Sequence, residues 1–171
     1  MDQIRISDIT MKQTEKEFTL SFKEKLEIPK LLDKLNVDVI ELEGIAQPKI
    51  DALRIKSVAS TVKNSIVAVP VALSQESVDA TWNALKEAKH PRLQVVASVS
   101  PVQMEYLFHK KPDAMLKSIE EIVTACCAKT SDVEFIADDA TRSDSTFLYK
   151  AIQTAIAAGA KTITVCDATG A

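Results

Sequence analysis

The stretch 132–167, DVEFIADDATRSDSTFLYKAIQTAIAAGAKTITVCD, predicts a strand, a helix and a second strand in succession. The run Asp132–Ile136 has the short, apolar and β-branched character of a buried strand. Ser143 or Asp144 is placed to cap a helix that ends before Gly159, and glycine is common just past a helix. Thr162–Cys166 is a second β-branched run. A strand, a helix and a strand in this order predict a βαβ unit with parallel strands.

The same alternation extends toward the N-terminus. Ile66–Leu73 is apolar throughout, as in a strand buried on both faces. The remaining strands are expected at 4–10, 37–42 and 93–99, and the remaining helices at 27–35, 48–63, 77–88, 102–109 and 112–128. Residues 11–24 are expected to form a long polar loop, and Pro29 is expected in the first turn of its helix. Six βα units fit either a doubly wound sheet or a partial (β/α)₈ barrel, and the pattern alone leaves both open.

Composition limits the classes of protein to which the chain can belong. A length of 171 residues suits a single domain, and the expected domain covers all of 1–171. The net charge is -3 and no basic block occurs, so no nucleic-acid partner is expected. No apolar run is long enough for a membrane span, and Met1–Thr10 lacks the apolar core of a signal peptide. The cysteines are odd in number, and two of the three, Cys126, Cys127 and Cys166, are adjacent. This favours reduced thiols and a cytoplasmic location.

Glycine and histidine are scarce. With only 3 glycines, no glycine-rich phosphate loop can be built. With only 2 histidines, His90 and His109, a multi-histidine metal site is nearly excluded within this chain. Neither histidine has a partner at ligand spacing, and both are expected on the surface.

Two segments carry a resemblance to a known family. Residues 132–144, DVEFIADDATRSD, resemble the segment DVEFSPEDATRSD of 2-isopropylmalate, homocitrate and citramalate synthases. Residues 155–170, AIAAGAKTITVCDATG, resemble their AIEAGATTINIPDTVG at the same spacing. Upstream, residues 99–104 (VSPVQM) are similar to TSDIHM, and residues 7–13 (SDITMKQ) lie where the family has FDTTLRD.

This resemblance implies a partial (β/α)₈ barrel and a Claisen condensation of acetyl-CoA with a 2-oxo acid. In such a reaction a divalent cation polarises the carbonyl group of the oxo acid, an arginine supports the developing oxyanion, and a base removes a proton from the acetyl methyl group. The functional residues are expected at the carboxyl ends of the barrel strands.

The resemblance also assigns candidate roles to individual residues. Lys12 lies in place of the arginine and Asp138 in place of a glutamate of strand five, so these two are the catalytic candidates. The substrate-binding candidates are the retained Glu41 and Thr141, together with Gln103 in place of a histidine and Ala168 in place of a threonine. Gln13 replaces the metal-binding aspartate, and the family's His-x-His ligands would lie beyond Ala171. No residue of this chain is therefore expected to bind a metal, and the cofactor is left unknown.

Each candidate also has a purely structural interpretation. Lys12 lies in a polar segment, where a solvated lysine is common. Asp138 and its neighbour Asp139 can be turn residues before a helix. Glu41 is expected to be paired, with Lys12 or Arg142 as the partner. Cys126 and Cys127 fit core packing better than redox chemistry or metal binding.

Three functional hypotheses remain open from the sequence. The first is an acetyl-CoA-dependent acyltransferase of the isopropylmalate, homocitrate or citramalate synthase type that takes a small 2-oxo acid. The second is a catalytically degenerate, self-associating barrel fragment that binds a small carboxylate or a protein partner. The third is metal-free chemistry with Lys12 or Asp138. A homo-oligomer is expected, formed through the edges near Ile4–Ile9 and Thr162–Val165.

Overall fold

The computed structural model describes residues 4–13 and 20–170. The chain divides into two compact units, which are described separately. Unit 1 is Met1–Pro70 with Asp79–Arg92, and unit 2 is Val71–Val78 with Leu93–Ala171. Helix α3 (Gln75–Leu85) is divided between the two units.

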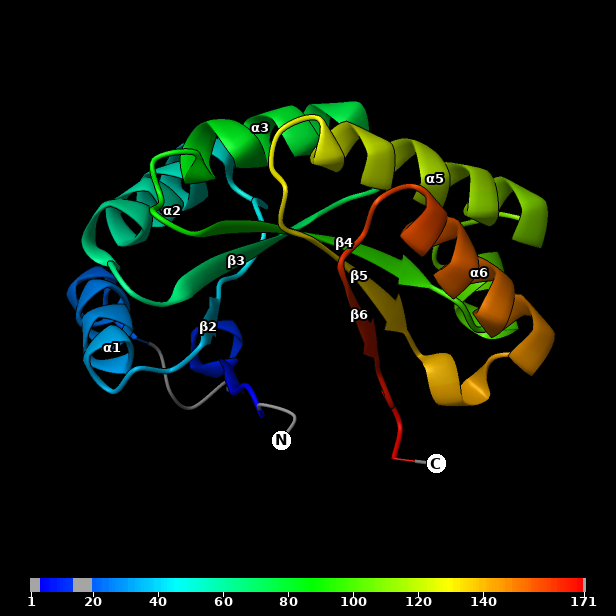
Figure 1. Ribbon diagram of the computed structural model, residues 1–171, viewed down its shortest axis with the longest axis horizontal. Helices are drawn as coiled ribbons and strands as arrows, with labels where there is room; N and C mark the ends of the chain where they lie inside the picture. The colour runs from blue at the N-terminus through cyan, green and yellow to red at the C-terminus, as the bar shows by residue number, and fades with distance from the viewer. Residues whose placement is uncertain (1–3, 14–19, 171) are drawn as a thin grey trace. The chain divides into compact units, whose positions relative to one another are not determined.

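Unit 1 contains parallel strands that follow one another in chain order, with a helix after each of the longer ones. Its elements are β1 (Ser7–Asp8), η1 (Thr10–Lys12), α1 (Phe22–Lys34), β2 (Val39–Glu41), α2 (Pro48–Thr61) and most of β3 (Ile66–Val71). Helices α1 and α2 pack against each other, as Figure 1 shows. β1 is much shorter than the strand expected at 4–10, because a 3₁₀ turn begins at Thr10, whose N–H bonds to the carboxylate of Asp8.

Helix α1 corrects two expectations from the sequence. It begins at Phe22, within the expected loop, because Ser21 and Glu24 form a reciprocal capping box. The Ser-x-x-Glu spacing that signals this start is visible in the sequence. Pro29 consequently lies inside the helix rather than in its first turn. Pro29 is tolerated there although its ring nitrogen carries no hydrogen and cannot donate a hydrogen bond to the preceding turn.

Asp33, near the end of α1, fastens this helix to the turn before β3. Its carboxylate accepts the backbone N–H groups of Lys63 (3.0 Å), Asn64 (2.8 Å) and Ser65 (2.8 Å). Burial by itself would raise the pKa of Asp33, but these N–H groups bond to the ionised form and bring the pKa below its ordinary value.

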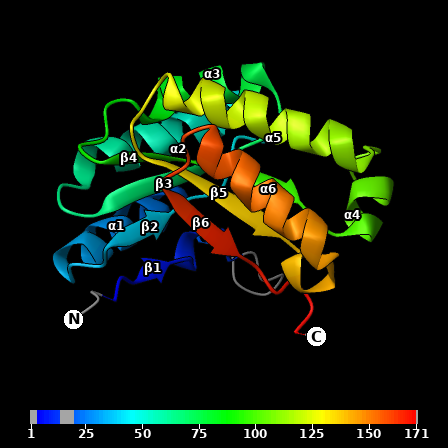
Figure 2. The ribbon, with the colours of Figure 1, turned by 45° about the vertical axis from the view of Figure 1, so that its right-hand side comes forward.

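Unit 2 repeats the arrangement with longer elements. These are most of β4 (Pro91–Ser98), α4 (Pro101–Tyr106), α5 (Pro112–Cys127), β5 (Val133–Asp138), η2 (Ala140–Arg142), α6 (Ser145–Ala157) and β6 (Thr162–Val165). β5 pairs with β4 on one side and β6 on the other, all in parallel. Figures 1 and 2 show α5 and α6 side by side over one face of these strands.

The two faces of β4 and β5 differ in chemistry. Leu93, Val95, Val133 and Phe135 are fully buried and form the apolar face that packs under the helices. Because side chains alternate along a strand, the intervening residues point to the opposite face. That face carries the polar residues Gln94, Ser98, Glu134 and Asp138, with Val96 and Ile136 between them.

The expected fold class, a partial (β/α)₈ barrel of about six parallel βα units, is confirmed. In each unit the strands are hydrogen-bonded in chain order, whereas a doubly wound sheet reverses its strand order part-way. The end of α6 is also as expected, since Gly159 has a φ of 113° at the position after Ala158.

Candidate functional site

The polar groups of unit 2 converge where β4 and β5 end. Ser98 and Asp138 are register partners at the last positions of these strands, so their side chains share a face. The Ser98 hydroxyl donates to the side-chain oxygen of Gln103, which lies in α4 directly after β4. Two sequence-predicted residues thus lie at neighbouring strand ends. Gln103 bonds to the buried Ser98, and Asp138 is the register partner of Ser98.

Gln103 and Asp138 both keep hydrogen-bonding capacity for a ligand. The amide oxygen of Gln103 is used by Ser98, while its NH₂ group bonds to no other residue among 4–13 and 20–170. The Asp138 carboxylate is half-buried and likewise lacks a hydrogen bond within this described part of the chain. A donor and an acceptor therefore flank the same strand ends.

The loop after β5 is held by a buried carboxylate. Asp139 is fully buried and has a left-handed backbone conformation, with φ 56°. It accepts two hydrogen bonds from Arg142 (Nε at 2.8 Å, Nη2 at 2.6 Å) and one from the Ser100 hydroxyl (2.5 Å). The bonds from Arg142, and next the bond from Ser100, hold the pKa of Asp139 below its ordinary value. Ser143 adds a bond from its hydroxyl to the carbonyl of Val99 at 2.8 Å.

These contacts fix where Asp138 lies. Ser100 and Val99 belong to the segment after β4, whereas Asp139 and Ser143 belong to the segment after β5. Hydrogen bonds between the two segments hold the strand ends in one arrangement. Asp139, Arg142 and Ser100 are thus structural supports of the candidate site. For Asp139 this agrees with the structural interpretation of the sequence, a turn residue before a helix.

Two further substrate-binding candidates lie nearby, but in different roles. Thr141 donates its hydroxyl to Asp167 at 2.9 Å, and Asp167 also accepts the N–H of Gly170 at 2.8 Å. Thr141 thereby orders the segment after β6. Ala168 is exposed in that segment and offers only backbone groups and a methyl group. Substrate binding by either residue stays a prediction.

Sequence reasoning missed a buried polar layer below the strand ends. Glu134 accepts a hydrogen bond from Gln94 (3.0 Å) on β4 and another from Thr164 (2.5 Å) on β6. Gln94 is fully buried and Glu134 is 5% exposed. The sequence did contain a signal for this layer. Gln94 and Glu134 are polar residues within otherwise apolar strands, and they lie four residues before Ser98 and Asp138, on the same face of their strands.

In unit 1, Lys12 and Glu41 are brought together at the ends of β1 and β2. Lys12 Nζ lies 2.5 Å from Glu41 Oε2, and Ser7 Oγ lies 2.6 Å from Glu41 Oε1. The lysine and glutamate side chains are 28% and 13% exposed. The expected structural pairing of Glu41 is therefore present with Lys12, while Arg142 pairs with Asp139.

The cysteine and histidine residues considered from the sequence lie in the environments expected for them. Cys126 is fully buried, and burial together with the neighbouring Cys127 raises its pKa to about 12, which fits the expected core packing. His90 and His109 are exposed, as expected.

Within residues 4–13 and 20–170, no helix has the length and apolar character needed to cross a membrane.

The described residues do not fit a divalent metal. No three carboxylate, histidine or cysteine side chains among them lie close enough together to hold one. Gln13, at the position of the family's metal-binding aspartate, offers a neutral amide, a weak ligand for a hard cation. We therefore derive no chemical step through a metal from these residues.

Comparison with known proteins gives the family. The sequence matches the HMGL-like family over residues 3–171. The chain belongs to the HMGL-like family. Over 99% of its length it is 36% identical to a 2-isopropylmalate synthase of Halalkalibacterium halodurans and 38% identical to one of Caulobacter sp. strain K31. A 2-isopropylmalate synthase of Aquifex aeolicus is 34% identical over the same share.

This HMGL-like chain spans about one third of each of these relatives, with 33% of their length covered. Among solved structures, a mandelate racemase/muconate lactonizing enzyme from Sorangium cellulosum aligns at TM-score 0.48 and 11% identity, over 87% of this chain and 44% of that one. That likeness is too distant to support an inference.

Proposed function

We propose that this chain is the 2-oxo-acid-binding part of an acetyl-CoA-dependent acyltransferase of the 2-isopropylmalate synthase type. Its identity to several such synthases over nearly its whole length supports the reaction class. The proposal rests on two side chains at neighbouring strand ends. The Gln103 amide bonds to Ser98, the last residue of β4, and the Asp138 carboxylate belongs to the register partner of Ser98 on β5. Strand carboxyl ends are where barrel enzymes of this fold bind their substrates.

The chemistry of a 2-oxo acid suits these two groups. Its carbonyl and carboxylate oxygens are acceptors, and the Gln103 NH₂ group supplies two N–H donors. In the condensation, the Asp138 carboxylate takes a proton from the acetyl methyl group. The methyl carbon then bonds to the 2-oxo carbon, and the oxygen that becomes negative accepts hydrogen bonds from donors such as Gln103 and then takes up a proton. Water cleaves the thioester of this product, which releases coenzyme A as the free thiol.

Lys12 enters the proposal through its position in the chain, where the family has an arginine. Its ammonium group supplies a positive charge for a developing oxyanion, although without the planar fork of an arginine. Glu41 holds the Lys12 side chain in place. We therefore propose Lys12 as a catalytic residue and Glu41 as the residue that positions it.

Variants of Gln103 and Asp138 test the proposal. Gln103→Met removes the N–H donors at nearly constant volume and is expected to weaken binding of pyruvate and 2-oxobutanoate roughly tenfold, the value of one charge-assisted hydrogen bond. Asp138→Asn is expected to leave binding within about threefold but to abolish acetyl-CoA-dependent thiol release. Binding is measured by calorimetry and thiol release with a colorimetric reagent.

Gln153→Met is the matched control, because Gln153 is exposed on α6 outside the site. It is expected to bind the oxo acids as the parent does. Equal binding by the Gln103 and Gln153 variants would remove Gln103 from the site. Unchanged thiol release in the Asp138 variant would exclude Asp138 as the base.

We also propose that the chain associates with itself. β1 and β6 each have a strand neighbour on one side only among the described strands. Large apolar side chains on or next to them are exposed, with Ile6 62% and Val165 56% accessible. Exposed edges of this kind favour pairing with another chain.

A further inference from the structure

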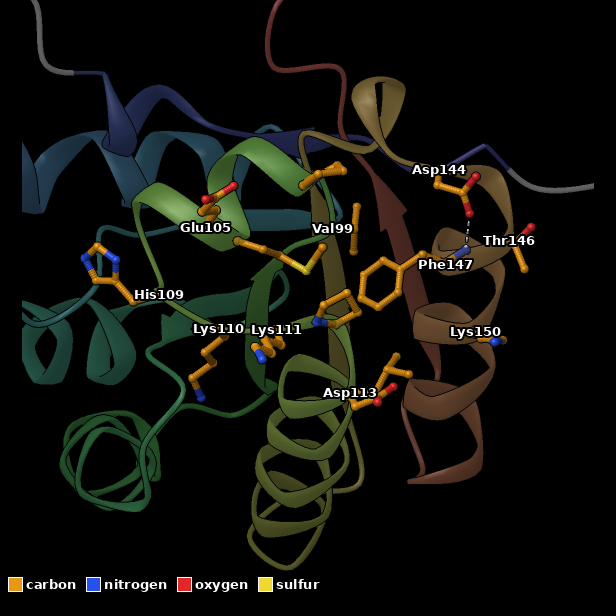
Figure 3. A pocket seen from close by; sticks show the side chains of 14 residues that line it. Val99, Glu105, His109, Lys110, Lys111, Asp113, Asp144, Thr146, Phe147 and Lys150 are labelled. Atoms are coloured by element: carbon orange, nitrogen blue, oxygen red, sulfur yellow. Dashed lines mark hydrogen bonds between the residues drawn. The ribbon is translucent and has the colours of Figure 1, made fainter.

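A cavity of about 670 Å³ lies in unit 2, lined by α4, the loop that follows it, and the first turns of α5 and α6 (Figure 3). Its volume is within the range of small-molecule sites in proteins. Neither Gln103 nor Asp138 lines it, so it is separate from the candidate site at the strand ends.

The interior of the cavity is mainly apolar. Val99, Met104, Leu116 and Phe147 contribute hydrocarbon and aromatic surface to it. Figure 3 shows the Phe147 ring turned into the cavity, near Val99. The ring is held there from its backbone, because the Phe147 N–H bonds to the Asp144 carboxylate, the N-cap of α6, at 3.0 Å. A flat or branched apolar group can pack against this surface.

The rim carries an excess of positive charge. Lys110, Lys111 and Lys150 lie on it, against the carboxylates of Glu105, Asp113 and Asp144. Asp144 caps α6 and Asp113 lies in the first turn of α5, where the partial positive charge of a helix N-terminus offsets each. The three ammonium and three carboxylate charges are equal in number, and the two helix N-termini, each about +0.5, leave the rim with a small positive excess.

Two of these lysines are available to a ligand. Lys110 donates to the hydroxyl of Ser118. Lys111 and Lys150 form no ion pair with any residue in the described part of the chain. Lys111 lies next to the apolar interior in Figure 3, whereas Lys150 lies farther out on α6.

We propose that this cavity is a binding site for an amphipathic anion, an apolar or aromatic group that bears one carboxylate. The apolar group packs on Phe147 and Met104, and the carboxylate bonds to the Lys111 ammonium. A cationic ligand of the same shape is repelled by the Lys111 ammonium and binds more weakly. The proposal is independent of the oxo-acid site.

Three isosteric probes test the charge preference. Naphthalene-2-carboxylate, its amide and its amidine have the same shape but carry negative, zero and positive charge. Nitrogen–proton correlation spectra of the whole chain are expected to show naphthalene-2-carboxylate shifting the amides of Leu116, Thr146 and Phe147. The carboxylate is expected to bind at least about fivefold more tightly than the amide, and the amidine most weakly.

Lysine variants test the position of the anion. Lys111→Met is expected to weaken binding of the carboxylate roughly three- to tenfold and to leave binding of the amide unchanged. Lys117→Met is the control, because Lys117 lies on α5, the helix that Lys111 precedes, is 76% exposed and does not line the cavity. Phe147→Ala is expected to weaken all three probes.

Three results would overturn the proposal. They are the absence of shifts at these amides with every probe, binding of the amidine as tight as that of the carboxylate, and equal carboxylate affinities in the Lys111 and Lys117 variants. Because both lysines are exposed, their replacement leaves the fold intact, and the comparison does not depend on the stability of the Phe147 variant.

Discussion

At the residue scale, Asp139 links the stability of the protein to pH. Its buried carboxylate is ionised and bonded to Arg142 and Ser100, which lowers its pKa in the folded state. A carboxyl group with a folded-state pKa below its unfolded one stabilises the fold above the unfolded value, about 3.9 for aspartate. This contribution is lost as the pH falls through the folded-state pKa.

Asp139→Asn is therefore expected to flatten the acid limb of the stability profile. Asparagine tolerates the left-handed backbone at this position, so the loop can still form. Urea unfolding between about pH 2 and 7 should show a lower free energy of unfolding for the variant near neutrality. At acid pH this free energy should change less steeply with pH, by the equivalent of up to one bound proton. An acid limb with the same slope as that of the parent would contradict this assignment.

Asp33 gives a second prediction at this scale. Asp33→Ala removes the acceptor of three backbone N–H groups and is expected to lower the free energy of unfolding by about 2–4 kcal/mol. Glu27→Ala on the same helix, at a side chain that is 54% exposed, is the control and is expected to change stability little. A similar loss in both variants would show that the Asp33 bonds contribute nothing specific.

At the scale of elements, the junction after α6 packs on the end of α5. Gly159 has a φ of 113°, and a Cβ at this position would lie 2.9 Å from Cys127 Sγ. Gly159→Ala thus adds both backbone strain and a steric contact, and is expected to cost about 1–3 kcal/mol in unfolding free energy. Denaturant unfolding measures the loss.

A double variant separates the two causes. Adding Cys127→Ala removes the sulfur but not the backbone strain, so it should recover only part of the stability lost in Gly159→Ala. Complete recovery would mean that the left-handed conformation costs nothing. No recovery would mean that contact with the sulfur contributes nothing to the stability lost in Gly159→Ala.

The sequence predicted these elements to different extents. Apolar periodicity places β3, β4, β5 and α5 within two or three residues, because long or fully buried runs have strong patterns. It misplaced the start of α1, where the Ser21–Glu24 capping box decided the boundary and the polar composition suggested a loop. β1 shrank to two residues because an Asx turn at Asp8 ends it.

The candidate site was less predictable than the elements. Gln103 and Asp138 could be named from the family resemblance, since both follow strands. Ser98, which bonds to Gln103 and lies opposite Asp138 in the sheet, could not be named, because a serine in an apolar strand has no distinctive pattern without strand register. The Glu134 layer was missed for the same reason, since it joins residues of three different strands.

At the scale of the whole molecule, the exposed edges predict self-association. Sedimentation velocity across a range of concentrations is expected to show a species heavier than the 18.7 kDa chain. Ile6→Lys places a charge next to β1 and Val165→Lys places one on β6, and both are expected to shift the distribution toward the monomer. Tyr149→Lys, at an exposed residue on α6, is the control and is expected to leave the distribution unchanged. A single monomeric boundary at every concentration would contradict the prediction.

The most direct test of the oxo-acid site is a titration of the isotope-labelled chain with pyruvate, followed through the side-chain NH₂ signal of Gln103. A saturable shift of this signal and of the backbone amides of Ser98 and Asp138 is expected, with no comparable shift at Gln153. If pyruvate, 2-oxobutanoate and 3-methyl-2-oxobutanoate, the acid whose acetyl adduct is 2-isopropylmalate, all leave the Gln103 signal unmoved or move only signals elsewhere, these strand ends do not bind a 2-oxo acid.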